Sequence, residues 1–130
     1  FIEEVSDSKR RAYVTLCKIL SEVEKFARAG VQCQLIYKKI LGLLQENGYE
    51  NKMPHHGGHG IGLTFFEKPV IDLESTDVLE LNRIIAVEIG IYIDGFGIRI
   101  ENVYCVTDEG LENMFNYPLE LEHFILTESR

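Results

Sequence analysis

The strongest strand signal in this 130-residue sequence is residues 84–89, IIAVEI. Its β-branched residues are typical of a buried strand. Residues 94–97, DGFG, follow as a turn, and Ile98–Thr107 is expected to return as the next strand. Together these segments predict an antiparallel hairpin. The chain is therefore expected to build its core around a sheet.

Two amphipathic helices are predicted before this hairpin. After the Ser6-Asp7-Ser8 cluster, which is suited to capping a helix start, apolar residues recur at spacings of three and four. Gly30 is expected to end this helix. A second helix is predicted from about residue 31 to residue 47, where Asn47-Gly48 supplies a left-handed stop. So short a joint predicts an αα-hairpin.

The middle of the chain has a different composition. Glycine, histidine and proline dominate residues 49–62, and short extended pieces are expected at residues 63–66 and 70–71. Phe65 and Phe66 would then point to opposite faces of a strand, so only one of them would enter the core. The predicted fold class is α+β, an αα-hairpin packed on a curved antiparallel sheet.

Composition excludes several classes of protein. Aspartate and glutamate outnumber lysine and arginine by 21 to 13, which gives a formal charge of -8 and makes nucleic-acid binding a poor expectation. No apolar run is long enough to span a membrane, and no signal peptide is visible. Cys17, Cys33 and Cys105 are odd in number and widely spaced, which favours free thiols in a reducing compartment. The expected location is the cytoplasm.

The length fits one domain. The chain begins at Phe1 with an apolar pair before any turn signal, and we expect it to be part of a longer protein. A mature chain trimmed after translation is the alternative.

The predicted hairpin carries two acidic residues among apolar neighbours. Glu88 is costly to bury unless it is paired, protonated or bound to a metal. Glu101 presents the same problem one strand away, and a divalent cation would hold both carboxylates together. Arg99, on the same strand face as Glu101, could compensate in the same way. Spacing alone leaves both interpretations open.

Three of the four histidines lie within the segment at residues 54–62, PHHGGHGIG. A histidine in such a glycine-rich loop has no core to fill, and the neutral imidazole of His59 suits manganese, iron, cobalt or zinc. A flexible, solvated loop is the alternative. A nucleotide-binding turn is rejected, because no strand is predicted before these glycines and no helix after them.

Several motifs then occur in a fixed order: HHGGHGIGL at 55–63, EKP at 67–69, VEIGIYI at 87–93, GIRIEN at 97–102 and VTDEG at 106–110. This series resembles the C-terminal half of the pita-bread metallopeptidases, the creatinase/methionine aminopeptidase family. Within that family it is most similar to the Xaa-Pro dipeptidases and Xaa-Pro aminopeptidases. The resemblance runs from about Arg10 to Pro118, and it implies that residues 1–130 are the C-terminal part of such a catalytic domain.

The resemblance also implies roles for individual residues. His59, Glu88 and Glu101 would be ligands of a pair of divalent metal ions (manganese, cobalt, iron or zinc) that cleaves off an N-terminal residue, often before proline. Glu88 would also handle the proton of the bridging water. His55 matches a histidine that approaches the substrate, and Arg99 an arginine that steadies the carboxylates. The expected partner is a peptide such as Xaa-Pro, and a homodimer is one assembly left open.

The sequence departs from the family pattern at several positions. Two aspartate ligands would lie upstream of Phe1, which could be the last trace of their strand, so the metal site is expected to be incomplete in this chain. Phe66 stands where the family has a catalytic histidine, and losing that donor would slow turnover by roughly 10²-fold or more. Ile89 replaces a proline, and Leu81-Asn82 replaces a Pro-Gly turn.

Two hypotheses follow from different classes of function. The first is a cytosolic, metal-dependent exopeptidase of the Xaa-Pro type, with the fragment alone inactive; it predicts that His59, Glu88 and Glu101 converge on the concave face of the sheet. The second is a pita-bread module that has lost its chemistry and binds peptides or proteins, which Phe66 favours. A third interpretation, an acidic α+β fold with no site, requires all the matching site residues to be coincidence.

Overall fold

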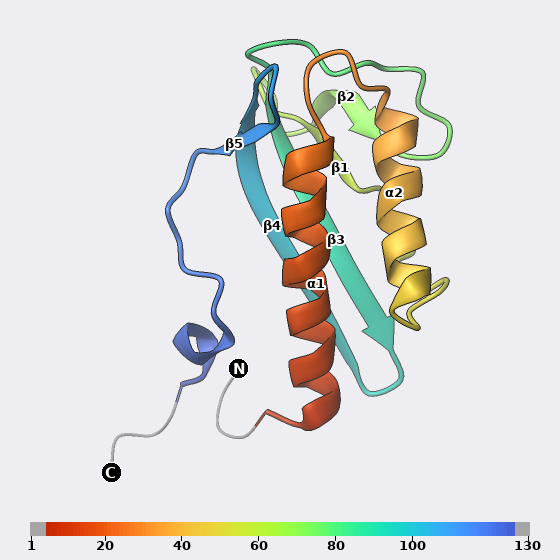
Figure 1. The fold of residues 1–130 in the computed structure, drawn as a ribbon, viewed down its shortest axis with the longest axis vertical. Coiled ribbons are helices and arrows are strands. Elements are labelled where there is room, and N and C mark those ends of the chain that lie inside the picture. The colour runs from red at the N-terminus through yellow and green to blue at the C-terminus, as the bar shows by residue number, and fades with distance from the viewer. Residues whose placement is uncertain (1–4, 127–130) are drawn as a thin grey trace.

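The structure is a computed structural model that describes residues 5–126. Figure 1 shows the helices α1 (Asp7–Phe26) and α2 (Cys33–Glu46) standing side by side in front of a sheet. Among the described residues, the sheet has five antiparallel strands in the order β2-β1-β3-β4-β5. The bounds of the remaining elements are Gly58–Gly60 for β1, Glu67–Ile71 for β2, Ile84–Ile93 for β3, Phe96–Val106 for β4, Leu111–Asn113 for β5 and Leu121–Phe124 for the 3-10 helix η1.

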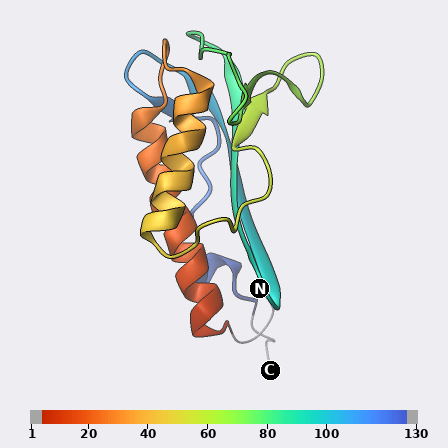
Figure 2. The same ribbon diagram turned by 90° about the vertical axis from the view of Figure 1, so that its right-hand side faces the viewer.

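The two helices form the predicted αα-hairpin and cover one face of the sheet, as Figure 2 shows in profile. The side chain of Ser6 caps α1 by accepting a hydrogen bond from the Lys9 amide. Each helix buries one apolar stripe, which includes Leu16 and Leu20 in α1 and Ile36 and Ile40 in α2. No helix within residues 5–126 is long and apolar enough to cross a membrane.

The joint between the helices is longer than predicted. The first helix stops at Phe26 rather than at Gly30, and the second begins at Cys33. The backbone between them bonds to other parts of the fold instead: Ala29 donates to the Thr107 carbonyl, and Gly30 donates to the Leu79 carbonyl. These hydrogen bonds replace those that another helical turn would have made. The sequence also predicts an extended start over residues 1–5, of which residues 1–4 lie outside the described residues.

The hairpin of β3 and β4 separates a buried face from an open face. Ile85, Val87, Ile89 and Ile91 are fully buried and point toward the helices. The residues between them, including Glu88, point to the opposite face. Because residues 84–93 pair continuously with residues 96–105, this register fixes which side chains of the two strands emerge together on the open face.

The strands before this hairpin differ from the prediction. Residues 63–66 form bends rather than a strand, and β1 is a strand that the sequence did not predict. The extended piece predicted at residues 70–71 is confirmed as part of β2. A Cβ at Gly58 would lie 2.3 Å from the Ala86 carbonyl oxygen, and one at Gly60 would lie 2.3 Å from the Lys68 carbonyl oxygen. Glycine therefore lets β1 pass close to its neighbours, and His59 lies on this strand rather than in a loop.

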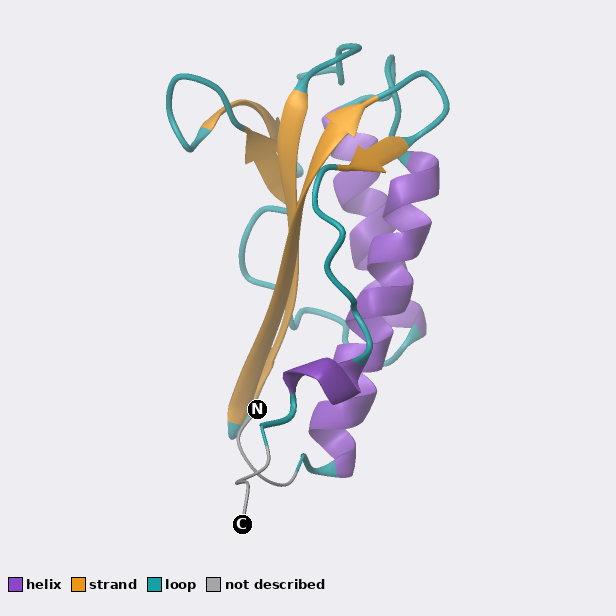
Figure 3. Cartoon of the chain, turned by 90° about the vertical axis from the view of Figure 1, so that its left-hand side faces the viewer, coloured by secondary structure: helices purple, strands orange, loops and turns teal. Residues whose placement is uncertain are grey.

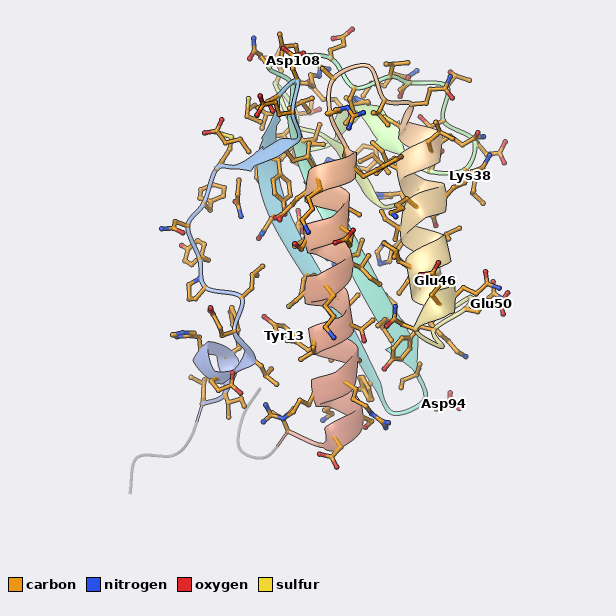
Figure 4. All side chains as sticks on the ribbon, in the orientation of Figure 1. Tyr13, Lys38, Glu46, Glu50, Asp94 and Asp108 are labelled. Carbon is orange, nitrogen blue, oxygen red and sulfur yellow. The ribbon has the colours of Figure 1, made fainter. Side chains whose placement is uncertain are left out.

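The segment 114–126 runs back from β5 along α1 to η1 (Figure 3). The Tyr13 hydroxyl donates to the Leu119 carbonyl at 3.0 Å, and Arg10 pairs with Glu122 at 2.9 Å. Tyr13 lies on the side of α1 that faces this segment, whereas Lys38 and Glu46 project from α2 into solvent (Figure 4). The segment therefore stays packed against the first helix.

Candidate metal centre on the open face of the sheet

The open face of the sheet gathers the predicted site residues. His59 pairs with Ala86, Glu88 pairs with Glu101, and Gly90 pairs with Arg99. Residues directly opposite each other in an antiparallel sheet point to the same side. The side chains of His59, Glu88, Arg99 and Glu101 therefore all emerge on the face that the helices leave uncovered.

Glu88 is the centre of this arrangement, and it is only 6% exposed. Its Oε2 atom lies 3.1 Å from Nη1 of Arg99. Its Oε1 atom lies 3.6 Å from Nε2 of His59 and 3.4 Å from Nδ1 of His56. Arg99 thus supplies the compensating charge that the purely structural interpretation requires, but to only one of the two carboxylate oxygens.

The tautomer of His59 indicates whether Oε1, the second oxygen of Glu88, could bind a cation together with this histidine. Nδ1 of His59 lies 3.0 Å from the Gly60 carbonyl oxygen, so this nitrogen carries the proton that it donates. In its neutral form, His59 therefore directs the lone pair of Nε2 at Oε1 of Glu88. Two acceptors facing each other in a buried place are unfavourable unless a proton or a metal cation lies between them. The donor set fits a cation at this position.

Glu101 completes the predicted ligand set only in part. It lies directly across from Glu88 on β4, but its side chain is exposed. No group of three histidine, cysteine, aspartate or glutamate side chains within residues 5–126 is arranged to hold a metal ion. Glu101 also lines a groove of about 500 Å³, together with Arg99 and Tyr117, between β4 and the segment 114–126. The structure brings His59 and Glu88 together, and the ligand roles stay predictions.

His55 is held firmly beside this pair. Its Nδ1 donates to the His56 carbonyl at 2.7 Å, and its own carbonyl accepts a hydrogen bond from the Tyr37 hydroxyl at 2.7 Å. Its ring meets that of Tyr92 edge-on at 5.5 Å. The other nitrogen, Nε2, is buried and has no hydrogen-bond partner in the described part of the chain. This unpartnered nitrogen is available to a ligand.

His56 is a residue for which the sequence predicts no role. Its Nδ1 atom is near Glu88 but lacks the geometry of a hydrogen bond within residues 5–126. Burial lowers the pKa of His56, although the Glu88 carboxylate opposes this shift. The only sequence signal was its place in the same histidine cluster. Nothing in the spacing showed that its ring would turn toward the buried carboxylate.

Phe66 does not lie on a strand, and neither it nor Phe65 enters the core: their exposed fractions are 41% and 83%. The prediction that the two residues lie on a strand, with room for only one of them in the core, is therefore wrong. The Thr64 hydroxyl donates to the Phe66 carbonyl at 2.8 Å, which holds a bend here, and β2 begins only at Glu67. The Phe66 ring instead stacks on His59, with ring centroids 4.5 Å apart.

Comparison with known proteins identifies the class to which this fold and site belong. The sequence profile of metallopeptidase family M24 matches residues 1–108. An uncharacterized peptidase from Staphylococcus haemolyticus is 35% identical over 108 residues, which cover 79% of this chain. The chain therefore belongs to metallopeptidase family M24. This result and the fold confirm the predicted resemblance to half of a pita-bread domain.

Solved structures point to one group of peptidases within the class. The X-Pro aminopeptidase from Thermotoga maritima superposes with a TM-score of 0.87, is 32% identical, and is similar over 97% of this chain. The Xaa-Pro dipeptidase from Bacillus anthracis gives a TM-score of 0.87 at 31% identity over 97% of this chain. The chain spans about a third of the length of these relatives, with 31% of the staphylococcal peptidase and 35% of each solved structure covered.

Proposed function

We propose that residues 1–130 form the C-terminal part of the catalytic domain of a metal-dependent exopeptidase of the Xaa-Pro dipeptidase or aminopeptidase type. The protein would hydrolyse an N-terminal peptide bond with a metal-activated water. The observation that carries this proposal is the approach of Nε2 of His59 to Oε1 of Glu88, which face each other at 3.6 Å on the open face. Membership of family M24 supports the reaction class.

Three side chains of this chain would hold the metal ions: His59 through Nε2, Glu88 through Oε1, and Glu101 from the neighbouring strand. By the family resemblance, two aspartates outside this chain would supply the remaining ligands. When bound, a pair of divalent cations such as manganese or cobalt lowers the pKa of a shared water and polarises the scissile carbonyl.

The residues around the Glu88 carboxylate have different roles in the proposed site. Arg99 holds Oε2 of Glu88 at 3.1 Å, which orients the carboxylate. The Glu88 carboxylate would also accept the proton of the attacking water. His55 directs its unpartnered Nε2 to the substrate. Phe65 and Phe66, whose rings lie around His59, shield this side of the site from water.

The remaining parts of the proposal concern the substrate and the location of the protein. The substrate is a short peptide, and the relatives named for Xaa-Pro cleavage favour one with proline in the second position. We place the protein in the cytoplasm, and its three cysteines, which are all free, support this location.

Hydrolysis of an Xaa-Pro dipeptide by the intact protein with manganese tests the proposal. Glu88→Gln keeps the shape of the side chain but cannot take the proton, so the rate should fall by about 10²-fold or more. Glu112→Gln is the matched control, because Glu112 is an exposed glutamate on β5, and its rate should equal that of the wild type. Equal rates for wild type and Glu88→Gln would overturn the proposed role of this carboxylate.

A second candidate function is a peptide-binding module without catalysis. Phe66 favours it, because a phenylalanine stacked on His59 has no hydrogen-bond donor for a developing oxyanion. An intact protein that binds manganese and an Xaa-Pro dipeptide, yet releases no amino acid, would establish this alternative and exclude the peptidase.

A further inference from the structure

His56 has a polar atom that the fold leaves without a partner. Its Nδ1 is buried and makes no hydrogen bond within residues 5–126, although Oε1 of Glu88 lies 3.4 Å away. A buried nitrogen in this condition costs free energy unless something else in the functional state binds it. The rest of the side chain remains 29% exposed on the open face, so a ligand can reach it.

The position of His56 is set by its surroundings. Its carbonyl accepts the hydrogen bond from His55, and the next residue, Gly57, donates to the Ile71 carbonyl at 2.7 Å and accepts from the Glu88 amide at 3.0 Å. The backbone that carries His56 is therefore tied to β2 and to β3 at once. The ring is held edge-on against Phe66 at 5.2 Å and against His59 at 5.7 Å. A side chain fixed in this way is preorganised rather than free to move.

We propose that His56 is a catalytic residue of this site, which donates a hydrogen bond from Nδ1 to the carbonyl oxygen of the bound peptide. This inference rests on the proposed peptidase function. It assigns to His56 the hydrogen-bond donation that Phe66, which has no donor, cannot provide. The Nδ1 atom lies 3.4 Å from the same carboxylate oxygen that faces His59 but makes no hydrogen bond to it. A peptide oxygen bound beside Glu88 would therefore come within reach of Nδ1. Such a donor stabilises the negative charge that develops on that oxygen during water attack.

Two substitutions in the intact protein distinguish the effect of the His56 hydrogen-bond donor from the effect of its ring packing. His56→Leu removes the nitrogen and keeps an apolar side chain against Phe66, whereas His56→Asn keeps an N–H near the position of Nδ1. With manganese and an Xaa-Pro dipeptide, we expect His56→Leu to lower kcat by about 10²-fold. We expect His56→Asn to lower kcat by less than about 10-fold. His123→Leu, at an exposed histidine of η1, is the matched control and should match the wild type. Equal losses for His56→Leu and His56→Asn would overturn the donor role.

A binding experiment tests the same role without turnover. Two uncleavable peptide analogues are compared by calorimetry: a ketomethylene analogue that retains the carbonyl oxygen, and a methylene analogue that lacks it. His56→Leu should weaken the ketomethylene analogue by about 10-fold and the methylene analogue by less than about 2-fold. Equal weakening of both analogues would assign His56 to packing and overturn the proposal. Loss of manganese binding in His56→Leu would also overturn it, because His56 would then act on the metal.

The two proposals fail in different ways. A wild type that binds manganese but cleaves no dipeptide refutes the peptidase function. In that case the two analogues still test the contact with the carbonyl oxygen, and a selective loss in His56→Leu supports the contact. A wild type that cleaves the dipeptide at the same rate as His56→Leu refutes only the role of His56.

Discussion

The two oxygens of Glu88 have different surroundings, and this difference is the chemical basis of the site. Oε2 is bound to Arg99, whereas Oε1 lies among two imidazole nitrogens. A carboxylate buried to serve stability alone would have both oxygens satisfied by donors. In the neutral form of His59, the nitrogen near Oε1 is an acceptor, since the other nitrogen donates to the Gly60 carbonyl. The unsatisfied side of Glu88 is therefore directed at a ligand.

Phe66→His tests how much the site loses by having a phenylalanine at this position. The imidazole would replace a ring that now stacks on His59 and would add a donor near Glu88, so hydrolysis of an Xaa-Pro dipeptide by the intact protein should become faster. Because Phe66 is 41% exposed, the free energy of unfolding should change by no more than about 0.5 kcal/mol. Steady-state kinetics and thermal denaturation measure the two effects.

The same substitution in a His56→Leu background is the informative control. If His56 already supplies part of the missing donor, Phe66→His should raise the rate of the double variant by a larger factor than it raises that of the wild type. If Phe66→His leaves the rate of hydrolysis unchanged or lowers it in both backgrounds, then the site does not lack a donor at position 66.

At the scale of elements, the sequence predicts best what local periodicity controls. The apolar stripes of α1 and α2 and the β-branched run of β3 follow directly from spacing. The turn of the β3–β4 hairpin lies within the predicted segment 94–97 but is shorter, because β4 begins at Phe96 rather than at Ile98. The strand β1 could not be predicted in the same way. Its sequence Gly58-His59-Gly60 has low strand propensity and becomes extended only because β2 and β3 bind it on both sides.

The candidate site also contains residues whose positions could be predicted and residues whose positions could not. His59 and Glu88 meet because strand pairing fixes their positions. The family resemblance, rather than spacing, predicted that these two side chains would converge, because His59 was expected in a loop. The carboxylate of Glu101 is exposed, so no packing fixes its direction, and the sequence could not show how it lies. His56 turns toward Glu88 because the backbone around Gly57 is tied to β2 and β3, a long-range contact that no local pattern contains.

Tyr104 links the two layers of the fold, and its loss should be measurable. Its ring is fully buried, and its hydroxyl donates to Oε1 of the half-buried Glu24 at 2.8 Å, which joins β4 to α1. Tyr104→Phe should therefore lower the free energy of unfolding by about 1 kcal/mol. Tyr117→Phe removes the same hydroxyl from a residue that is 74% exposed and should change stability little. Urea denaturation of both variants makes the comparison, and equal stability of the two would show that the hydrogen bond between Tyr104 and Glu24 contributes nothing.

At the scale of the whole molecule, the sheet has one face covered by helices and one face that carries the candidate site (Figure 2). The ligands proposed here come from a chain that covers about a third of its relatives, 35% in the case of the Thermotoga maritima enzyme. With His59, Glu88 and Glu101 as the proposed ligands, the chain should bind metal weakly, because a closed site prefers four or more ligands.

Calorimetric titration of residues 1–130 with manganese and with cobalt checks this expectation. The chain should show weak binding or none, and the intact protein should bind two ions. Glu88→Gln in the intact protein should weaken binding, whereas Glu112→Gln should not. Tight binding of two ions by residues 1–130 alone would mean that the described residues rearrange into a complete site.

The most direct test of the central claim is to locate the metal. Crystals of the intact protein grown with manganese, measured near the manganese absorption edge, give an anomalous map that places each ion without reference to activity. We expect anomalous peaks on the open face of the sheet, from ions bound to Nε2 of His59 and to the carboxylate of Glu88. Peaks located only elsewhere, with His59 and Glu88 still facing each other and no ion between them at saturating manganese, would contradict it.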